Sequence, residues 1–413
     1  MPNEGLGNEQ PALTRHYKRL LAGADALGGA GALESLAPET TAGPGLDLSE
    51  GAVDERMGGT RAELHRIVKE FLGDKPELQD IADKIARDGK TALKMVGDEN
   101  DAGLASTEIL ASLEVIVRTD GSRPSFMVRN GVPDRKTSPV GTWGLTLDDS
   151  LDKLRAAIEC VGRIDDPSGA QGFQGTGILV AENLVMTNRH VLQAIASQAP
   201  NGSWTLRSNI TIDFGHEFRA QDSLRQRTVN GVVFAGSKPI DPFAIDHGKL
   251  DLALLELARP ASAAEKPKEV LALDASTDWG QAETGVFIIG FPGNPGFGSN
   301  APSLLELLFR STYGCKRLAP GTVSTTATGL AASPRHWSLA HDATTLGGNS
   351  GSAVVVIGRE RITAGLHYGG RMSDPRENWC HVLGRTLDQT AGRSAKTLRE
   401  ILTERGVKLD ERR

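Results

Sequence analysis

The chain has 413 residues with 46 basic and 52 acidic side chains, so its formal net charge is −6 at pH 7. This balance, without a basic stripe interleaved with aromatic residues, argues against a general nucleic-acid binder. The apolar content is ordinary for a globular protein, and the length predicts roughly two or three domains.

The start of the chain and the cysteines indicate the cellular compartment. The first residues lack the basic region and apolar stretch of a signal peptide, and no run of about 18 apolar residues predicts a membrane span. Three cysteines are too few and too scattered for a disulfide framework. We therefore expect a cytoplasmic protein without membrane association. Scattered histidines and the lack of a phosphate-binding loop predict no metal and no cofactor.

The first 59 residues predict little regular structure. Residues 14–25 favour a short helix, whereas residues 28–59 are rich in Gly, Ala, Pro and acidic residues. Such a composition gains little by burial and predicts a flexible linker.

Helical signals then return. Thr60 and Glu63 form a capping-box pair at the start of an apolar pattern with helical spacing. A second helix is expected over Pro76–Gly89 and a third over residues 104–113. Residues 60–112 thus predict a small helical bundle.

Two β-rich runs within residues 113–131 flank Asp120 and Gly121, a pair that favours a hairpin turn. Thr146 follows and can cap a helix whose apolar residues share one face. The two features predict a hairpin and a connecting helix between the bundle and the rest of the chain.

From Val161 onward, short β-rich segments alternate with Gly and Pro turns, which favours a β-barrel or sandwich. A last helix is expected near residues 394–405, ended by Gly406. The predicted organisation is a linker segment, a helical bundle, a hairpin with its helix, a β domain and a C-terminal helix: 1–59, 60–112, 113–160, 161–390 and 391–413.

Three segments carry a nucleophile, a base and an acid. They are GTGILVAENLVMTNRHV, ending at His190 and Val191, HGKLDLALLEL with Asp251, and HDATTLGGNSGSAVVV with Ser350. Each alone is typical of an ordinary strand end or turn. Together they predict a catalytic triad, because serine needs a general base and histidine needs a buried carboxylate to fix its tautomer.

The glycines beside Ser350 fit the same chemistry. An oxyanion must be met by backbone N–H groups with no Cβ in the way, and Gly347 and Gly348 permit such a turn. The N–H groups of Gly348 and Ser350 are therefore the expected oxyanion donors.

The sequence resembles the trypsin-like peptidases of the chymotrypsin superfamily over residues 160–385, particularly the bacterial V8-like glutamyl endopeptidases. TNRHV, LDLA, GFPG and TTLGGNSGSAV resemble family segments and follow the family order His, Asp, Ser. The resemblance implies a mainly β fold of two antiparallel six-stranded β-barrels with the site between them, here preceded by a small α-helical domain. An α/β-hydrolase is disfavoured, because Ser352 replaces the second glycine of its nucleophile motif.

The resemblance also implies a substrate preference. In the glutamyl-endopeptidase branch, the positions of Thr345 and His367 lie in the pocket for the residue before the scissile bond (P1), where imidazolium and hydroxyl bind an acidic side chain. One departure concerns Asn349. Digestive trypsin-like enzymes carry an acid at that position to pair with a newly freed N-terminus, so that route of activation is not expected here.

We therefore expect a serine endopeptidase acting on protein or peptide substrates through an acyl-enzyme, with a P1 preference for Glu or Asp. The alternative is a catalytically silent trypsin-like binding module or adaptor. The N-terminal helical region is expected either to dock a regulatory protein partner or to act as a packing subdomain of the barrels.

Overall fold

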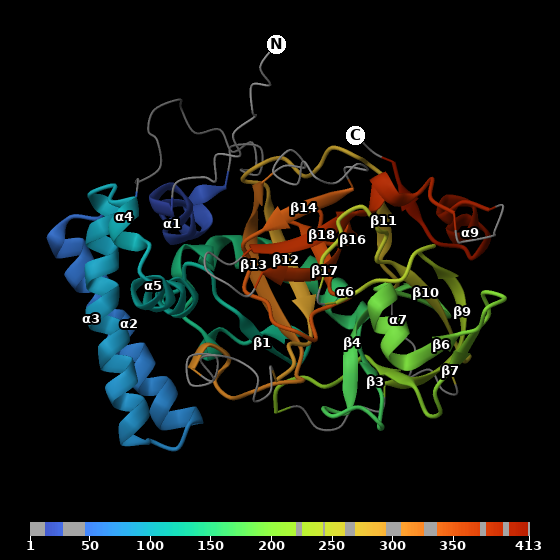
Figure 1. The fold of residues 1–413 in the computed structure, drawn as a ribbon, viewed down its shortest axis with the longest axis horizontal. Helices are drawn as coiled ribbons and strands as arrows, with labels where there is room; N and C mark the ends of the chain where they lie inside the picture. The colour runs from blue at the N-terminus through green and yellow to red at the C-terminus, as the bar shows by residue number, and fades with distance from the viewer. Residues whose placement is uncertain are drawn as a thin grey trace, which may run out of the picture.

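The structure is a computed structural model that describes nine ranges of the chain: 13–27, 46–219, 225–242, 244–260, 269–294, 307–325, 337–371, 377–390 and 396–411. Three parts lie side by side: helices from the N-terminal third, a β-barrel in the middle and a second barrel beyond it (Figure 1). Most of the linker prediction, residues 28–45, lies outside the described residues.

The first barrel in sequence order lies on the right in Figure 1. It closes through antiparallel pairings in the order β10-β5-β4-β3-β8-β9. Its strands are β3 (Val161–Asp165), β4 (Phe173–Ala181), β5 (Leu184–Thr187), β8 (Thr211–Asp213), β9 (Gln226–Ala235) and β10 (Ala253–Leu257). It closes because β10 pairs with both β5 and β9. Strand β3 begins at Val161, where the β-rich pattern of the sequence begins.

The other barrel is built from the C-terminal half. Its strands are β12 (Gly285–Gly290), β13 (Arg317–Thr325), β14 (Ser338–His341), β15 (Ala353–Val356), β17 (Gly365–Arg371) and β18 (Glu377–Val382). The order β12-β15-β17-β18-β14-β13 closes because β12 also pairs with β13. Two antiparallel six-stranded barrels behind a helical region confirm the predicted fold class.

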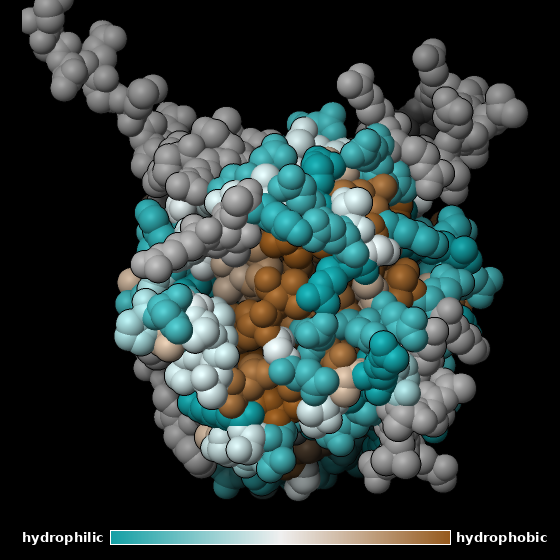
Figure 2. Space-filling model, turned by 90° about the vertical axis from the view of Figure 1, so that its right-hand side faces the viewer, coloured by the Kyte–Doolittle hydropathy of each residue, from teal (hydrophilic) through white to brown (hydrophobic). Residues whose placement is uncertain are grey.

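Short elements join and cover the barrels. They are η1 (Gly23–Ala26), β1 (Phe126–Arg129), β2 (Val132–Pro133), η2 (Arg135–Thr137), η3 (Gly141–Trp143), α6 (Gly144–Cys160), α7 (Arg189–Ile195), β6 (Ala196–Gln198), β7 (Trp204–Leu206), β11 (Ala272–Asp274), β16 (Ile362–Thr363), η6 (Leu383–Thr386), α9 (Leu398–Glu404) and β19 (Leu409–Asp410). Seen from the end opposite the N-terminal helices, the rim of the molecule is mostly hydrophilic and apolar residues gather toward the middle (Figure 2). None of the described helices is long and apolar enough to cross a membrane.

The N-terminal helices differ from the sequence expectations. They are α1 (Leu13–Leu21), α2 (Glu50–Phe71), α3 (Pro76–Gly97), α4 (Asp101–Leu104) and α5 (Thr107–Thr119). The expected capping box is wrong, because Thr60 lies inside α2 and its hydroxyl donates to the Arg56 carbonyl. Helix α2 also takes in residues 50–59 of the expected linker.

Helix α3 does not stop at Gly89. A Cβ placed there would lie 1.8 Å from Ile116 Cδ1, so this glycine lets α5 approach α3 closely rather than ending the helix.

The hairpin expected at Asp120 is also wrong, since the β-branched run before it forms α5. Burial on a helical face outweighed the strand preference of those residues.

Two buried histidines predict loss of stability in mild acid. His341 and His381 are each 1% exposed, and burial lowers the pKa of each to about 4. Below the unfolded-state pKa near 6.5, these histidines bind protons in the unfolded chain but stay neutral in the folded chain. The free energy of unfolding therefore falls as the pH drops from about 6.5 to 4. We expect the melting temperature to fall across that window, and the part of the fall above about pH 5.5 to come before the carboxylates of the unfolded chain titrate. A flat melting temperature would contradict this.

Candidate active site

His190 is positioned at the start of a short helix. Strand β5 ends at Thr187, and His190 is the second residue of α7. Its backbone N–H donates to Asp251 Oδ1 at 2.9 Å, and its Nδ1 lies 2.6 Å from Asp251 Oδ2. One carboxylate therefore holds both the backbone and the ring of the histidine. The proton sits on Nδ1 in this pairing, which leaves Nε2 as an acceptor.

Asp251 lies just before β10 and is 4% exposed. Burial alone would raise the pKa of its carboxyl, but the electrostatic attraction to the His190 ring and the two hydrogen bonds from His190 outweigh that cost and lower the pKa. Its backbone is fixed as well, because Asn188 Nδ2 donates to the Asp251 carbonyl at 2.8 Å and the Asp251 N–H donates to His381 Nε2 at 3.1 Å. The carboxylate is thus charged and held from both sides.

His381 is a residue that the sequence gave no reason to single out. It lies on β18, far along the chain from Asp251, and its ring stacks on Tyr368 with centroids 4.4 Å apart. Because burial keeps the ring neutral, Nε2 can accept the backbone N–H of Asp251. No spacing rule links the two positions, so only the folded chain reveals the contact.

Ser350 shares a pocket with both residues. The pocket has a volume of about 170 Å3 and is lined by His190, Ile240, Asp241, Pro242, Ile245, Asp246, Lys249, Asp251, Ser350, Tyr368, Gly369 and Gly370. Among the hydrogen bonds of the described residues, none joins His190 to Ser350. Catalytic hydrogen bonds are often long in an enzyme without substrate and shorten only when substrate binds. All three residues of the predicted triad therefore come together in one pocket.

The loop that carries Ser350 is tied to the other barrel. Thr176 on β4 donates its N–H to the Ser350 carbonyl at 2.8 Å and its hydroxyl to the Gly348 carbonyl at 2.9 Å. These bonds place a residue of the second barrel beside His190 and Asp251 of the first. The site accordingly lies where the two barrels meet.

The backbone on either side of Ser350 has a defined orientation. The Gly347 carbonyl accepts the Gly293 N–H at 2.6 Å, and the Asn349 carbonyl accepts the Ser352 N–H at 2.8 Å. A planar trans peptide directs its N–H opposite to its carbonyl, so the N–H groups of Gly348 and Ser350 point away from those partners. Neither N–H donates to any part of the chain that the structure describes. Two unused donors are what an oxyanion requires.

Gly348 and Gly347 offer a matched pair of substitutions. Gly348 has φ +91°, and a Cβ there would lie 2.6 Å from both the Gly293 nitrogen and the Phe291 carbonyl, whereas a Cβ at Gly347 meets nothing within 4 Å. We expect Gly348→Ala to destabilise the protein by about 1–3 kcal/mol, and Gly347→Ala to have little effect. Thermal or denaturant unfolding measures both. Equal losses would show that sterics do not select glycine at 348.

The two expected specificity residues lie beside the pocket rather than in its lining. Thr345 Oγ1 donates to Asn378 Oδ1 at 2.7 Å, and His367 Nδ1 lies 3.1 Å from His341 Nε2. His367 is 2% exposed, and burial, with His341 and His190 nearby, holds its pKa well below the usual range. The expected imidazolium is therefore corrected to a neutral ring in the free protein.

One cluster in the described residues has side chains close enough to share a metal ion. Ligand atoms of Asp165, Asp213 and His216 lie within 4.8 Å of one another. Arg163 already contacts the cluster, with Nε 2.6 Å from Asp165 Oδ1 and Nη2 2.8 Å from His216 Nε2. This guanidinium supplies the positive charge that the carboxylates need, so the cluster is an ion-pair network.

The chain is similar to known peptidases. A family model described as a trypsin-like peptidase domain matches residues 175–361. A probable serine protease of Lysobacter enzymogenes is 30% identical over 279 residues, which cover 63% of this chain and 70% of that protein.

Solved structures of proteases are similar to this chain as well, among them two of low sequence identity. The inactive form of the Rv3671c protease is 16% identical, with a TM-score of 0.33 over 62% of this chain and 93% of that one. An inactivated protease paralogue of the scabies mite is 12% identical, with a TM-score of 0.37 over 56% and 91%. On the relative and the family model, with the paired barrels and the pocket between them, the chain belongs to the trypsin-like serine peptidases.

Proposed function

We propose that this chain is an active serine endopeptidase in which Ser350 is the nucleophile and His190 the general base. Asp251 orients His190 and stabilises the imidazolium that forms during the reaction. The observation that carries the proposal is the double contact of Asp251 with His190 inside the pocket that Ser350 lines. A buried carboxylate that leaves Nε2 unprotonated prepares the ring to accept a proton from a hydroxyl.

In the proposed reaction, Ser350 Oγ attacks the scissile carbonyl while its proton passes to His190 Nε2. The oxyanion is held by the N–H groups of Gly348 and Ser350. His190 then gives the proton to the leaving amine as the C–N bond breaks, which leaves an acyl ester on Ser350. Water, deprotonated by the same ring, attacks the ester and releases the second product.

Covalent labelling tests the assignment. The full chain should react with a fluorophosphonate probe, and the mass increase should map to the peptide that contains Ser350. The variants Ser350→Ala and His190→Ala should both lose the label. A folded wild-type protein that takes up no label would favour the alternative, a trypsin-like domain that binds other proteins without cleaving them.

We also propose an acidic P1 residue, bound through His367 and Thr345. Among the described residues His367 Nε2 has no hydrogen-bond partner, and it is not sealed from solvent. If His341 Nε2 donates to His367 Nδ1, the neutral His367 keeps its proton on Nε2 and can donate it to a carboxylate. With this tautomer His341 Nδ1 is an unprotonated acceptor, and it has no hydrogen-bond partner among the described residues.

A pair of peptides differing only by Glu or Gln at P1 tests this preference. The wild type should cleave the Glu peptide faster, and His367→Leu should lower the Glu-to-Gln ratio by about tenfold or more, since a charge-assisted hydrogen bond is lost. Ile245→Ala is the control, because Ile245 lines the pocket without a polar group. Cleavage after Lys or Leu with Glu ignored would refute the preference.

The N-terminal helices complete the proposal. They share a hydrophobic core with Leu307, Leu308, Phe309 and Leu346 of the peptidase region. We propose that the helical region regulates the peptidase through this contact, and that any protein partner would act by changing it.

A further inference from the structure

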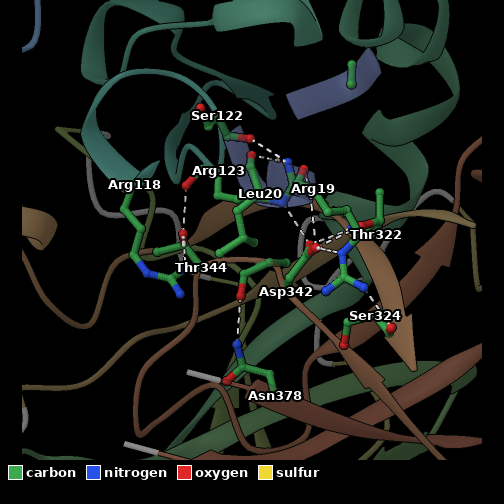
Figure 3. Close-up of polar contacts among 12 residues, drawn as sticks. Arg19, Leu20, Arg118, Ser122, Arg123, Thr322, Ser324, Asp342, Thr344 and Asn378 are labelled. Atoms are coloured by element: carbon green, nitrogen blue, oxygen red, sulfur yellow. Dashed lines mark hydrogen bonds and ion pairs between the residues drawn. The ribbon is translucent and has the colours of Figure 1, made fainter. Parts of the chain in front are cut away.

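The segment that leads to Ser350 is held from outside its own barrel. Residues 342–346, here called the anchor segment, follow β14 and precede the glycines of the nucleophile loop. Asp342 is 2% exposed and accepts two hydrogen bonds from Arg123, from Nε at 2.8 Å and from Nη2 at 3.0 Å (Figure 3). Thr322 on β13 of the same barrel donates two more hydrogen bonds to this carboxylate, from its N–H at 2.7 Å and from its hydroxyl at 2.8 Å. Arg123 lies just after α5, so the N-terminal region supplies the charged partner of the carboxylate.

Arg123 connects three parts of the molecule. Its side chain is fully buried, and Nη1 donates to the carbonyls of Leu20 at 3.1 Å and Ser122 at 2.8 Å. Arg19 of α1 approaches the same carboxylate, with Nε 3.6 Å from Asp342 Oδ2. Burial would raise the pKa of Asp342, but the charge of Arg123 lowers it far below its usual range. The carboxylate is thus ionised and fixed to α1 and to the end of α5.

A second arginine holds the middle of the anchor segment. Arg118 Nη1 donates to Thr344 Oγ1 at 2.8 Å, and the same hydroxyl donates to the Arg123 carbonyl at 2.7 Å. Arg118 is itself held by Glu114, with Nη2 2.8 Å from Oε2, and both side chains are almost fully buried. Because the guanidinium is fixed on its own helix, Thr344 is fixed with respect to α5.

The end of the anchor segment is apolar. Leu346 is 4% exposed and packs in the core of the N-terminal helices, not in the core of its barrel. Only Gly347, Gly348 and Asn349 separate it from Ser350. The barrel holds the anchor segment as well, through Asn378 on β18, which bonds to Thr345 and to the Ala343 carbonyl. The position of the oxyanion donors therefore depends on the contacts with α1 and α5 in addition to those with the barrel.

The side chain of Asn349, next to Ser350, does not anchor the nucleophile loop. Within the described residues its side-chain oxygen accepts one local bond, from Ser352 Oγ at 3.3 Å, and an amide carries no charge that could form an ion pair. We propose that Arg123 and Arg118 are positioning residues through which the N-terminal helical region holds the nucleophile loop in its reactive conformation, so that this region is a built-in activator of the peptidase. The inference rests on the proposed function of Ser350.

The expected consequence is a loss of reactivity rather than of binding. If the anchor segment is released, the peptide before Gly348 can rotate and withdraw an oxyanion donor, a loss that costs about 100- to 1000-fold when complete. Partial release should lower the maximal rate of phosphonylation of Ser350, k2, by about tenfold to hundredfold. The dissociation constant of the initial complex, KI, should change little for a probe without an acidic group, because such a probe does not use Thr345 and the residues that line the pocket lie outside the anchor segment.

The experiment measures k2 and KI separately for a fluorophosphonate probe on the full chain. Arg123→Met removes the ion pair with Asp342. Thr344→Val removes both hydrogen bonds of the hydroxyl while keeping the size of the side chain. Both should lower k2, and Thr344→Ser should restore it. If Arg123→Met fails to fold, the pair at Thr344 decides the question.

Glu63→Gln is the matched control. Glu63 on α2 pairs with Arg310 of the peptidase region at 2.7 Å, so the change weakens the same interface without touching the anchor segment. It should leave k2 unchanged even if the melting temperature falls.

Two results would overturn the inference. One is an unchanged k2 in Thr344→Val, and the other is an equal fall of k2 in Glu63→Gln. If the wild type takes up no probe at all, the proposed function itself fails, and this outcome is distinct from both.

Discussion

Replacing Ser350 by alanine is expected to lower the kcat for peptide cleavage by roughly 10^6-fold, with KM little changed. The substitution removes the only atom that forms the acyl ester, while the oxyanion donors and the pocket stay in place. Steady-state kinetics on a fluorogenic peptide, with mass spectrometry to detect the acyl-enzyme in the wild type, measures the effect. The residual rate should still exceed that of the uncatalysed reaction, because binding and oxyanion contacts remain.

Ser352→Ala is the control for that change. Ser352 is two residues further along, fully buried, and its hydroxyl contacts Asn349 rather than the pocket. This variant should lose stability more than activity. If Ser350→Ala cleaved the peptide about as fast as Ser352→Ala while both remained folded, Ser350 would not be the nucleophile.

Replacing Asp251 by asparagine should lower kcat by about 10^4-fold near neutral pH. The asparagine amide can donate to His190 Nδ1, which moves the ring proton to Nε2 and leaves no acceptor for the serine hydroxyl. The geometry of the site should remain close to that of the wild type, because asparagine has the size of aspartate. Activity and fluorophosphonate labelling should fall together.

Asp246→Asn separates this effect from a general change of charge in the pocket. Asp246 lines the same pocket, but its carboxylate is half exposed and pairs only loosely with Lys249 at 3.9 Å. Its substitution should change kcat by less than about tenfold. A similar loss in both variants would mean that pocket charge, rather than the orientation of His190, drives the rate.

The barrels were predictable from sequence because their signals are local. Short β-rich runs with Gly and Pro turns begin at Val161, and the first barrel strand begins at the same residue. The helical third was predicted less well. Residues 113–119 are rich in β-branched side chains, yet they form the end of α5 because Ile116 packs against the backbone at Gly89. Such packing depends on a partner distant in sequence, which a local pattern does not contain.

The amino-acid sequence alone determined which residue types could supply nucleophile, base and acid, and in which order, because that chemistry tolerates few substitutes. It also determined the β character of the C-terminal part, since alternation and turn residues act over a few positions. Tertiary structure alone decided the neutral state of His367 and the hydrogen bond from the Asp251 N–H to His381. It also decided the contacts of Arg118 and Arg123 with the anchor segment. These depend on burial and on pairs of residues separated by up to 226 positions, and desolvation and long-range pairing arise only when the chain is folded.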